Sequence, residues 1–349
     1  MHVPDGFIDL QTSLAAGAAA TAAVVVALRG ARRELNEGAA PLAGLVAAFI
    51  FAVQMLNFPV AAGTSGHLLG GALAAVLVGP YTGMLCVTVV LLTQSFLFAD
   101  GGLTALGVNV TDMAVTTTLV GYGLFRALLA ILPRGPRSVT VAAFAGALVS
   151  VPAAACAFTV LYALGGTTDV AVGTVFAAMT GVHVLIGVGE AVITALTVGA
   201  VLAVRPDLVH GARGTARPLL LRGPSGQPLP TAAPAPSRSP RRFAVTAMAV
   251  TLVLAGFVSY YAATTPDGLE KVAQDKGIDR AAEEHAAKDS PLADYQVKDV
   301  GDERASGALA GVVGVGVTLV AGTGVLVVLR RRRGRRDDPL PEARRTEAV

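Results

Sequence analysis

The chain contains little charge for its length. Charged residues make up only 15% of its 349 residues, whereas a soluble domain carries about 25%. Hydrophobic residues make up 53% and occur in long blocks. Runs of about 18 or more apolar residues are typical of membrane spans. The composition therefore excludes a single soluble globular core and indicates a membrane protein with several spans.

Cysteine is scarce, and motifs for ATP hydrolysis are absent. Cys86 and Cys156 each lie within an apolar run and lack the paired spacing of zinc or redox sites, so we expect packed thiols. No GxxxxGK(S/T) phosphate loop occurs, and all four lysines lie within 264–306, which excludes ATP hydrolysis of the P-loop type. Uphill transport would need a partner ATPase or an ion gradient. No set of nucleophile, base and orienting residue is recognisable, so we expect no enzyme activity, no cofactor and no nucleic-acid partner.

The apolar runs predict an all-α fold, a polytopic membrane helix bundle of about seven spans followed by a two-span C-terminal module with an outer loop. The spans are expected at about 11–29, 40–57, 67–79, 81–98, 107–132, 139–163, 182–204, 243–263 and 307–329. The third is short for a hydrocarbon core of about 30 Å, and the turn sequence GPYTG follows it, so we expect a tight helical hairpin there. Residues 171–181 are expected to form a separate short helix beside the seventh span.

Composition divides the chain into four parts. Residues 1–205 form the predicted membrane domain, and residues 206–242 form a linker rich in Pro, Gly, Ser and Arg. Residues 243–329 form the two-span module, whose polar loop at 264–306 holds eleven acidic and six basic residues. Residues 330–349 form a tail that opens with the basic block RRRRGRR. The linker and the tail are therefore basic, whereas the loop between the last two spans is acidic.

Arginines between the spans indicate the orientation of the chain. These arginines fall on the same side of the membrane as the basic linker and the basic tail if the N-terminus is outside. The arginines are Arg29, Arg32, Arg33, Arg126, Arg134, Arg137 and Arg205. The positive-inside rule then predicts a multi-pass protein of the plasma membrane, embedded in the lipid bilayer, with the C-terminus in the cytoplasm. The N-terminus, the acidic loop, the loop before His67 and the loop at 100–107 would share the outer face.

The first two residues form a metal chelator when the amino terminus is free. No basic segment precedes the first apolar run, and the bulky His2 disfavours removal of Met1, so we expect the mature chain to begin at Met1. The Met1 amine and the His2 amide nitrogen close a five-membered ring on a metal, and the His2 amide and imidazole close a six-membered ring. His67, at the head of the third span, is the obvious fourth ligand. Four planar nitrogens favour Ni(II) or Cu(II).

Four further polar residues fall at membrane depth or at the start of a span. His183 and Glu190 lie on one face of the seventh span. They either form a satisfied pair that joins helices or serve as functional groups. Asn109 and Asp112 begin the fifth span. They either cap it or support the metal loop as hydrogen-bond acceptors.

The N-terminal sequence, MHVPDGFID, resembles the Met-His-Ile-x-(Asp/Glu)-Gly-Phe opening of the CbiM/NikM proteins. These are the substrate-capture (S) components of energy-coupling-factor (ECF) cobalt and nickel transporters. The resemblance covers about residues 1–205 and continues through GTSGHLLGGALAAVLVGP at 63–80, LLTQSFLFADGGLTALGVNVTDM at 91–113 and GVHVLIGVGEAVITAL at 181–196. It implies ligation of Ni²⁺ or Co²⁺ by the Met1 amine, the amide and imidazole of His2, and the His67 imidazole. It also implies two partners, a transmembrane coupling (T) component and cytoplasmic ABC ATPases.

The C-terminal half resembles the PDGLE domain, a NikN/CbiN-like small subunit with two spans around an outer loop. The matching segments are YYAATTPDGLEKVAQDKG at 260–277 and SPLADY at 290–295. The chain thus resembles an M–N fusion, in which the outer loop would either contact the N-terminal loops and help the metal to enter the chelate or serve as a passive tether. Two positions depart from the family pattern. Pro4 stands where a hydrophobic residue is common, and Asp100 stands where a histidine is common, which leaves the 100–103 loop without a direct role taken from the family.

Two other functions fit the same sequence. A self-sufficient transporter would be driven by protons through Glu190 and His183. A membrane assembly or signalling protein would use its outer loop to bind a partner. Metal uptake that requires a co-expressed ATPase would distinguish a capture subunit from a self-sufficient transporter. Metal retained by the purified protein would distinguish a capture subunit from an assembly or signalling protein. The choice between cobalt and nickel stays open.

Overall fold

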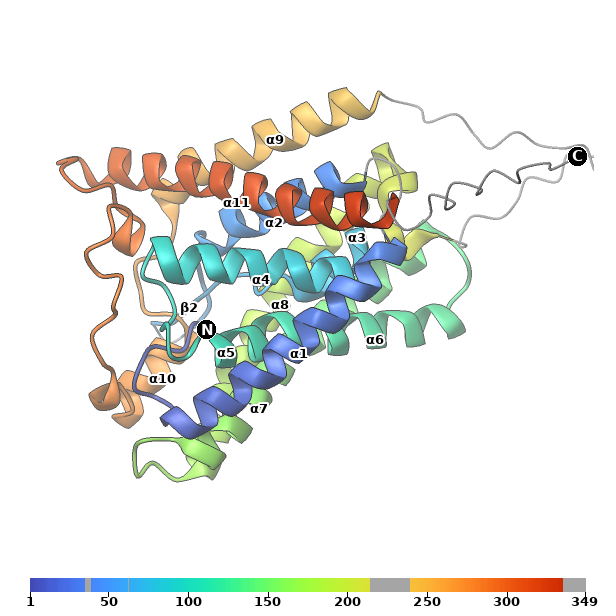
Figure 1. Ribbon diagram of the computed structural model, residues 1–349. Coiled ribbons are helices and arrows are strands. Elements are labelled where there is room, and N and C mark those ends of the chain that lie inside the picture. The colour runs from blue at the N-terminus through green and yellow to red at the C-terminus, as the bar shows by residue number, and fades with distance from the viewer. Residues whose placement is uncertain (35–38, 62, 214–238, 335–349) are drawn as a thin grey trace, which may run out of the picture.

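The computed structural model describes the chain except residues 35–38, 62, 214–238 and 335–349 (Figure 1). The first domain comprises α1 (Leu10–Glu34), α2 (Ala39–Gln54), α3 (Gly71–Val78), α4 (Pro80–Leu97), α5 (Leu106–Asn109), a π-helical turn (Val110–Thr116), α6 (Thr117–Ile131), α7 (Pro136–Gly165) and α8 (Val172–Val204). The second comprises α9 (Pro240–Gly256), α10 (Gly268–Lys276) and α11 (Glu303–Gly334). Two short strands, β1 (Phe58–Pro59) and β2 (Ser65–Gly66), pair antiparallel before α3. Most of the predicted linker and tail lies outside the described residues.

The polytopic helical bundle predicted from the sequence is confirmed. Seven helices in the described part of the chain are long and apolar enough to cross a membrane. They are α1, α4, the continuous segment Leu106–Ile131, α7, α8, the segment Arg241–Tyr261 and α11. α2 is also apolar but has only 16 residues. All nine predicted spans therefore coincide with helices.

The hairpin predicted after the third span is also present. α3 contains eight residues, which rise about 12 Å, so it cannot cross a core of about 30 Å. Gly79 ends α3 with φ of 101°, a left-handed conformation that glycine adopts without steric cost. Pro80 then begins α4, where its missing N–H would have no helical partner anyway. The chain thus reverses within two residues, and α3 packs against α4.

The separate short helix expected at 171–181 is wrong. These residues form the first turns of α8, a single helix of 33 residues. The segment contains isolated glycines but no proline, and isolated glycines are tolerated within helices. In lipid, a break would leave backbone groups unpaired, so a continuous helix is favoured. α8 is about 50 Å long and extends beyond a single membrane thickness.

Small residues allow the helices of the first domain to approach closely. A Cβ atom at Gly146 on α7 would collide with the carbonyl oxygen of Gly121 on α6. At Gly187 on α8, it would lie 2.7 Å from the Leu148 carbonyl oxygen on α7. Association of helices in lipid depends on such close backbone packing, because lipid offers no hydrophobic driving force between helices. The α6–α7–α8 layer therefore forms a firm support for the loops at its end.

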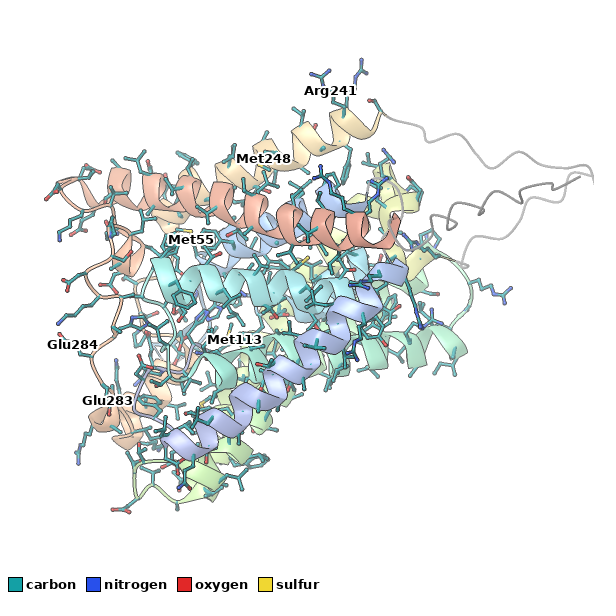
Figure 2. All side chains as sticks on the ribbon, viewed as in Figure 1. Met55, Met113, Arg241, Met248, Glu283 and Glu284 are labelled. Carbon is teal, nitrogen blue, oxygen red and sulfur yellow. The ribbon has the colours of Figure 1, made fainter. Side chains whose placement is uncertain are left out.

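The second domain lies along α2 and reaches the end of the bundle where the N-terminus lies (Figure 1). α9 and α11 pack against α2 and against each other, and α10 lies in the loop between them. The two ends of the bundle differ in charge, as Figure 2 shows with Glu283 and Glu284 at one end and Arg241 at the other. This distribution is the one expected from the sequence, and the orientation of the ends relative to the cytoplasm stays a prediction.

Candidate metal site

The first residues fold back into the protein and do not project into solvent. Met1 is 2% exposed and Val3 is fully buried. Val3 donates its N–H to Asn109 Oδ1 (2.7 Å) and accepts from Asn109 Nδ2 at its carbonyl (3.1 Å). Asp5 accepts the backbone N–H groups of Leu103 and Thr104. Asn109 therefore holds the N-terminal segment and makes no side-chain cap, and its role beside a bound metal stays a prediction.

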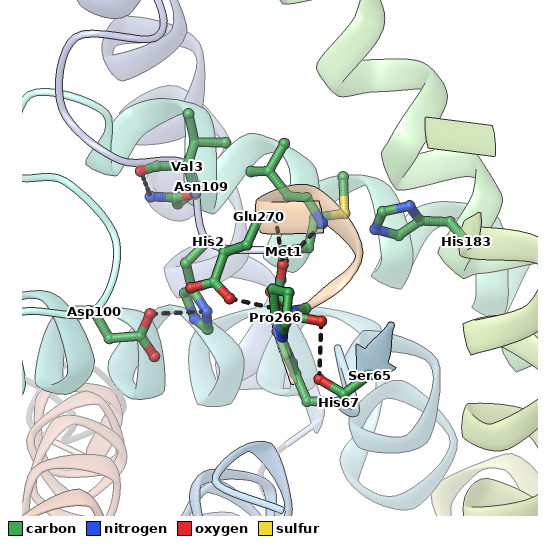
Figure 3. Close-up of polar contacts among 12 residues, drawn as sticks. Met1, His2, Val3, Ser65, His67, Asp100, Asn109, His183, Pro266 and Glu270 are labelled. Carbon is green, nitrogen blue, oxygen red and sulfur yellow. Dashed lines mark hydrogen bonds and ion pairs between the residues drawn. The ribbon is translucent and has the colours of Figure 1, made fainter. Parts of the chain in front are cut away.

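The Met1 amine meets the His67 imidazole, the two groups that the sequence predicted to share a site (Figure 3). Their nitrogens, Met1 N and His67 Nε2, lie 2.6 Å apart. His67 Nδ1 lies 3.0 Å from the Leu68 carbonyl oxygen, which can only accept, so Nδ1 carries the hydrogen. That tautomer leaves a lone pair on Nε2 in the neutral ring, which is the arrangement typical of a metal-binding histidine.

The His2 imidazole lies beside these groups but faces oxygen atoms. Its Nδ1 is 3.2 Å from Asp100 Oδ1, and its Nε2 is 3.1 Å from Gln94 Oε1. Its ring stacks on that of His67, with centroids 5.1 Å apart. Burial lowers the pKa of His2 to about 4, against the opposing charge of Asp100. The 100–103 loop, for which no direct role was expected, thus holds the imidazole of His2.

Asp267 completes the cluster, and the sequence analysis did not single it out. Its Oδ2 pairs with the Met1 amine and lies 3.4 Å from His67 Nε2. Burial raises the pKa of this carboxyl, but the charge of the N-terminal amine outweighs burial and holds the pKa well below its usual range. Asp267 is therefore an ionised carboxylate in contact with two nitrogens of the predicted site.

The placement of Asp267 follows from the PDGLE motif itself. Its Oδ1 caps α10 by accepting the N–H groups of Leu269 (2.8 Å) and Glu270 (2.9 Å). Glu270 in turn accepts the Asp267 N–H, which completes a capping box. Ser65 of β2 donates its N–H (2.9 Å) and its hydroxyl (3.2 Å, Figure 3) to the carbonyl of Pro266, the residue before Asp267. The spacing D-x-x-E signalled the cap, but no local pattern signalled the contact with Met1.

A cavity of about 410 Å³ adjoins this cluster between the N-terminal loops and the outer loop. Its lining includes His2, His67, Asp100, Asp267, Glu270, Glu283 and His285. Burial, and then the charge of Asp267, raise the pKa of Glu270. In the described part of the chain, no group of three or more His, Cys, Asp or Glu side chains is arranged to hold a metal ion. Capture at this cluster would therefore depend on main-chain nitrogens at the N-terminus.

His183 and Glu190 do not form the expected pair. Seven residues separate them along one helix, which corresponds to about 10 Å and exceeds the reach of a hydrogen bond. Glu190 instead accepts the N–H groups of Leu69 (2.6 Å) and Gly70 (3.1 Å), so it ties α8 to the segment after His67. His183 donates from Nδ1 to the Met179 carbonyl (2.7 Å). Its Nε2 has no hydrogen-bond partner among the described residues, and the ring lies toward Met1 (Figure 3).

Asp112 fulfils neither role expected for it. It is fully buried in the π-helical turn between α5 and α6. Neither of its carboxyl oxygens has a hydrogen-bond partner within the described residues, so it neither caps a helix nor supports the metal loop. The extra residue in a π-helical turn shifts side chains around the helix axis, which sequence spacing at 3.6 residues per turn cannot anticipate.

Comparison with known proteins agrees with both halves of the chain. Residues 2–208 match the CbiM family, described as the cobalt uptake substrate-specific transmembrane region, and residues 241–331 match the PDGLE domain. A putative fused nickel transport protein NikMN of Archaeoglobus fulgidus is 32% identical over 324 residues, which cover 92% of this chain and 97% of that protein. A putative metal transport protein of Haloquadratum walsbyi is 40% identical over 209 residues, covering 60% of this chain and 93% of that protein.

A solved structure also resembles the first domain. It is the crystal structure of a truncated transition metal transporter, with a TM-score of 0.51 and 30% identity, covering 58% of this chain and 99% of the solved one. The chain therefore belongs to the CbiM family of cobalt uptake substrate-specific transmembrane regions and carries a PDGLE domain after it.

Proposed function

We propose that the chain is the substrate-capture component of an ECF-type importer and binds Ni²⁺ or Co²⁺ at the outer face of the plasma membrane. The ligands would be the Met1 amine, the His2 amide nitrogen, the His2 imidazole and the His67 imidazole. The observation that carries the proposal is the lone pair of His67 Nε2, which faces the Met1 amine at 2.6 Å. Relatives named as cobalt and nickel transport proteins support this choice of substrates.

The distance between Met1 N and His67 Nε2 fits two neighbouring ligands of a square-planar metal site. With metal–nitrogen bonds of about 2.0 Å, adjacent nitrogens lie about 2.8 Å apart, close to the separation of Met1 N and His67 Nε2. In the proposed arrangement these two nitrogens are neighbours, because His67 stands opposite the His2 amide. The His2 imidazole must leave Asp100 and turn about its side-chain bonds to complete the set. Capture is therefore expected to reorient one side chain while the backbone of residues 1–3 stays held by Asn109.

Burial of the ligands explains how an ion would be retained. Met1 is 2% exposed and His67 is 5% exposed, so an ion bound to both would lose nearly all of its contact with water. Imidazole and amine nitrogens suit nickel and cobalt, whereas Mg²⁺ and Ca²⁺ prefer oxygen ligands. A site dominated by nitrogen thus discriminates against the abundant hard cations. Transport across the membrane would require the T component and ABC ATPases, since the chain has no P-loop motif of its own.

Replacement of single ligands tests the proposed site. His2→Ala and His67→Ala should each weaken binding of NiCl₂ or CoCl₂ to the purified chain at least about 100-fold, more than the loss of a supporting partner typically costs. His210→Ala is the matched control, because His210 lies against Tyr122, which belongs to α6, away from the cluster. Isothermal titration calorimetry measures both. Near wild-type affinity in His67→Ala would show that the fourth ligand is wrong.

The alternative of a proton-driven transporter depended on proton exchange between Glu190 and His183. Each oxygen of Glu190 already accepts a backbone N–H, and His183 is too far away to exchange a proton with it directly. Uptake of ⁶³Ni²⁺ by cells separates the two functions. We expect uptake above background only when the T component and ATPases are co-expressed, and uptake by the chain alone would contradict the proposal.

A further inference from the structure

Asp267 brings the PDGLE domain into direct contact with the proposed ligands. Its Oδ2 pairs with the Met1 amine and lies 3.4 Å from His67 Nε2. We propose that Asp267 is the oxygen ligand at which an incoming divalent cation first binds, before the nitrogens take the ion over. The inference rests on the proposed function, because it takes the Met1 and His67 nitrogens as final ligands.

Three donor atoms already converge on one position. Met1 N and His67 Nε2 lie 2.6 Å apart, and Asp267 Oδ2 is next to both. A cation about 2.0–2.1 Å from the two nitrogens would lie beside Oδ2 without a large movement of the chain. The lone pairs of His67 and Asp267 hold the Met1 ammonium group in this structure. A divalent ion carries twice the charge of that group and is attracted by the same atoms.

The two oxygens of Asp267 have separate tasks. Oδ1 is committed to α10, whose first N–H groups it accepts from Leu269 and Glu270. Oδ2 is directed away from the helix, toward the N-terminus. Because rotation of the carboxylate would break both cap bonds, the direction of Oδ2 is set in advance. Glu270 is not equivalent, since one of its own oxygens accepts the Asp267 N–H.

Asp267 also borders both the cavity and the space beside the Met1 amine. It lines the cavity of about 410 Å³ beside the outer loop, and it also borders the small space that Met1, His67 and His183 surround. A cation with six water molecules of about 30 Å³ each occupies roughly 180 Å³, so a hydrated ion fits the cavity. An ion that enters through the cavity would reach Asp267 and His67 before the Met1 amine, which does not line the cavity.

The chemistry of the handover balances as a series of ligand exchanges. The carboxylate oxygen first replaces one water molecule on the hydrated cation. Nitrogens then replace further waters, and the amine and the amide release their protons to solvent as they bind. Because the completed site would hold the ion with four nitrogens, Asp267 should control the rate of capture more than the final affinity.

The test compares two aspartates on the same segment. Asp267→Asn keeps the size of the side chain and its ability to cap α10, since asparagine is as good an N-cap residue as aspartate. Asp275→Asn makes the same change of charge near the end of α10, at a residue that pairs with Lys271 and is half exposed. Stopped-flow absorbance after mixing the full chain with NiCl₂ or CoCl₂ gives the association rate. Titration to the end point gives the fraction of competent sites by which that rate is normalised.

We expect Asp267→Asn to slow association at least about tenfold, whereas Asp275→Asn matches the wild type. Asp267→Glu, which keeps the charge but displaces the oxygen, should fall between them. Association of Asp267→Asn at the wild-type rate or faster would overturn the inference. The carboxylate would then serve only to hold the metal-free N-terminus in place. If His67→Ala abolishes binding in the same experiment, that result leaves the proposed function intact. If His67→Ala binds normally, the proposed function itself fails.

Discussion

Asn109→Ala should weaken metal binding although Asn109 is not a proposed ligand. The side chain makes two buried hydrogen bonds to the backbone of Val3, at 2.7 and 3.1 Å. Alanine would leave the N–H group of the fully buried Val3 without a partner, whereas the Val3 carbonyl would still accept the N–H of Gly102 (2.9 Å). An unsatisfied buried group costs about 1–3 kcal/mol, so the docked form of residues 1–3 should lose about 1–3 kcal/mol.

The lost free energy weakens metal binding because fewer molecules have the N-terminus docked beside His67. When only a fraction of molecules holds Met1 beside His67, the apparent dissociation constant rises by the inverse of that fraction. The docked form is favoured in the wild type by some free energy. Once the loss exceeds that free energy, each further 1.4 kcal/mol weakens apparent binding about tenfold. Because docking in the wild type absorbs part of the cost, we expect affinity for Ni²⁺ to fall about tenfold, and at most about 100-fold.

Isothermal titration calorimetry with NiCl₂ measures this effect, and Thr111→Ala provides the control. Thr111 lies two residues along the chain and its hydroxyl donates to the Gly107 carbonyl of its own helical segment, so it does not contact the N-terminus. Circular dichroism should verify the fold of both variants, because the chain has no tryptophan for a fluorescence assay. Wild-type affinity in a folded Asn109→Ala protein would refute the view that Asn109 positions the chelate.

Two further predictions concern protons and the terminal amine. Acetylation of Met1, or a tag before it, should abolish Ni²⁺ binding because the amine can no longer donate its lone pair, whereas a C-terminal tag should be harmless; full uptake by an N-terminally tagged chain would refute the chelate. Affinity should rise from about pH 5 to 8, because the metal must displace protons from the amine and the amide. Burial lowers the pKa of His2 to about 4, so protonation of its ring should contribute to that slope only near the acidic end of the range. Calorimetry at several pH values measures the slope, and a flat profile would indicate that carboxylates hold the metal.

Much of the architecture follows from local properties of the sequence. Hydropathy predicted the long spans, because a helix in lipid must satisfy its own backbone and present apolar side chains over a set length, whereas α3 is too short to cross by itself. The chelate proposed for Met1 and His2 also rests on the sequence, since its rings would be closed by consecutive residues. The fit of His67 to the same site followed from topology, which places both loops at one end of the bundle.

Other features depend on distances that no local pattern contains. The continuity of α8, the separation of Glu190 from His183 and the unpaired carboxyl of Asp112 all follow from how helices run and pack. The sequence indicated that the acidic loop would approach the N-terminus, but it did not identify the atom that makes contact.

What the sequence by itself determined is the set of long apolar helices and the family resemblance, and it also suggested the nitrogen ligands proposed at the first two residues. The tertiary structure alone decided that Asp267 meets Met1 and His67. Hydropathy and chelate rings arise within short segments, whereas residues 1, 67 and 267 become neighbours only when two domains fold against each other. The capping box fixed one oxygen of Asp267 locally, and the packing of α10 on the first domain determined where the other oxygen points.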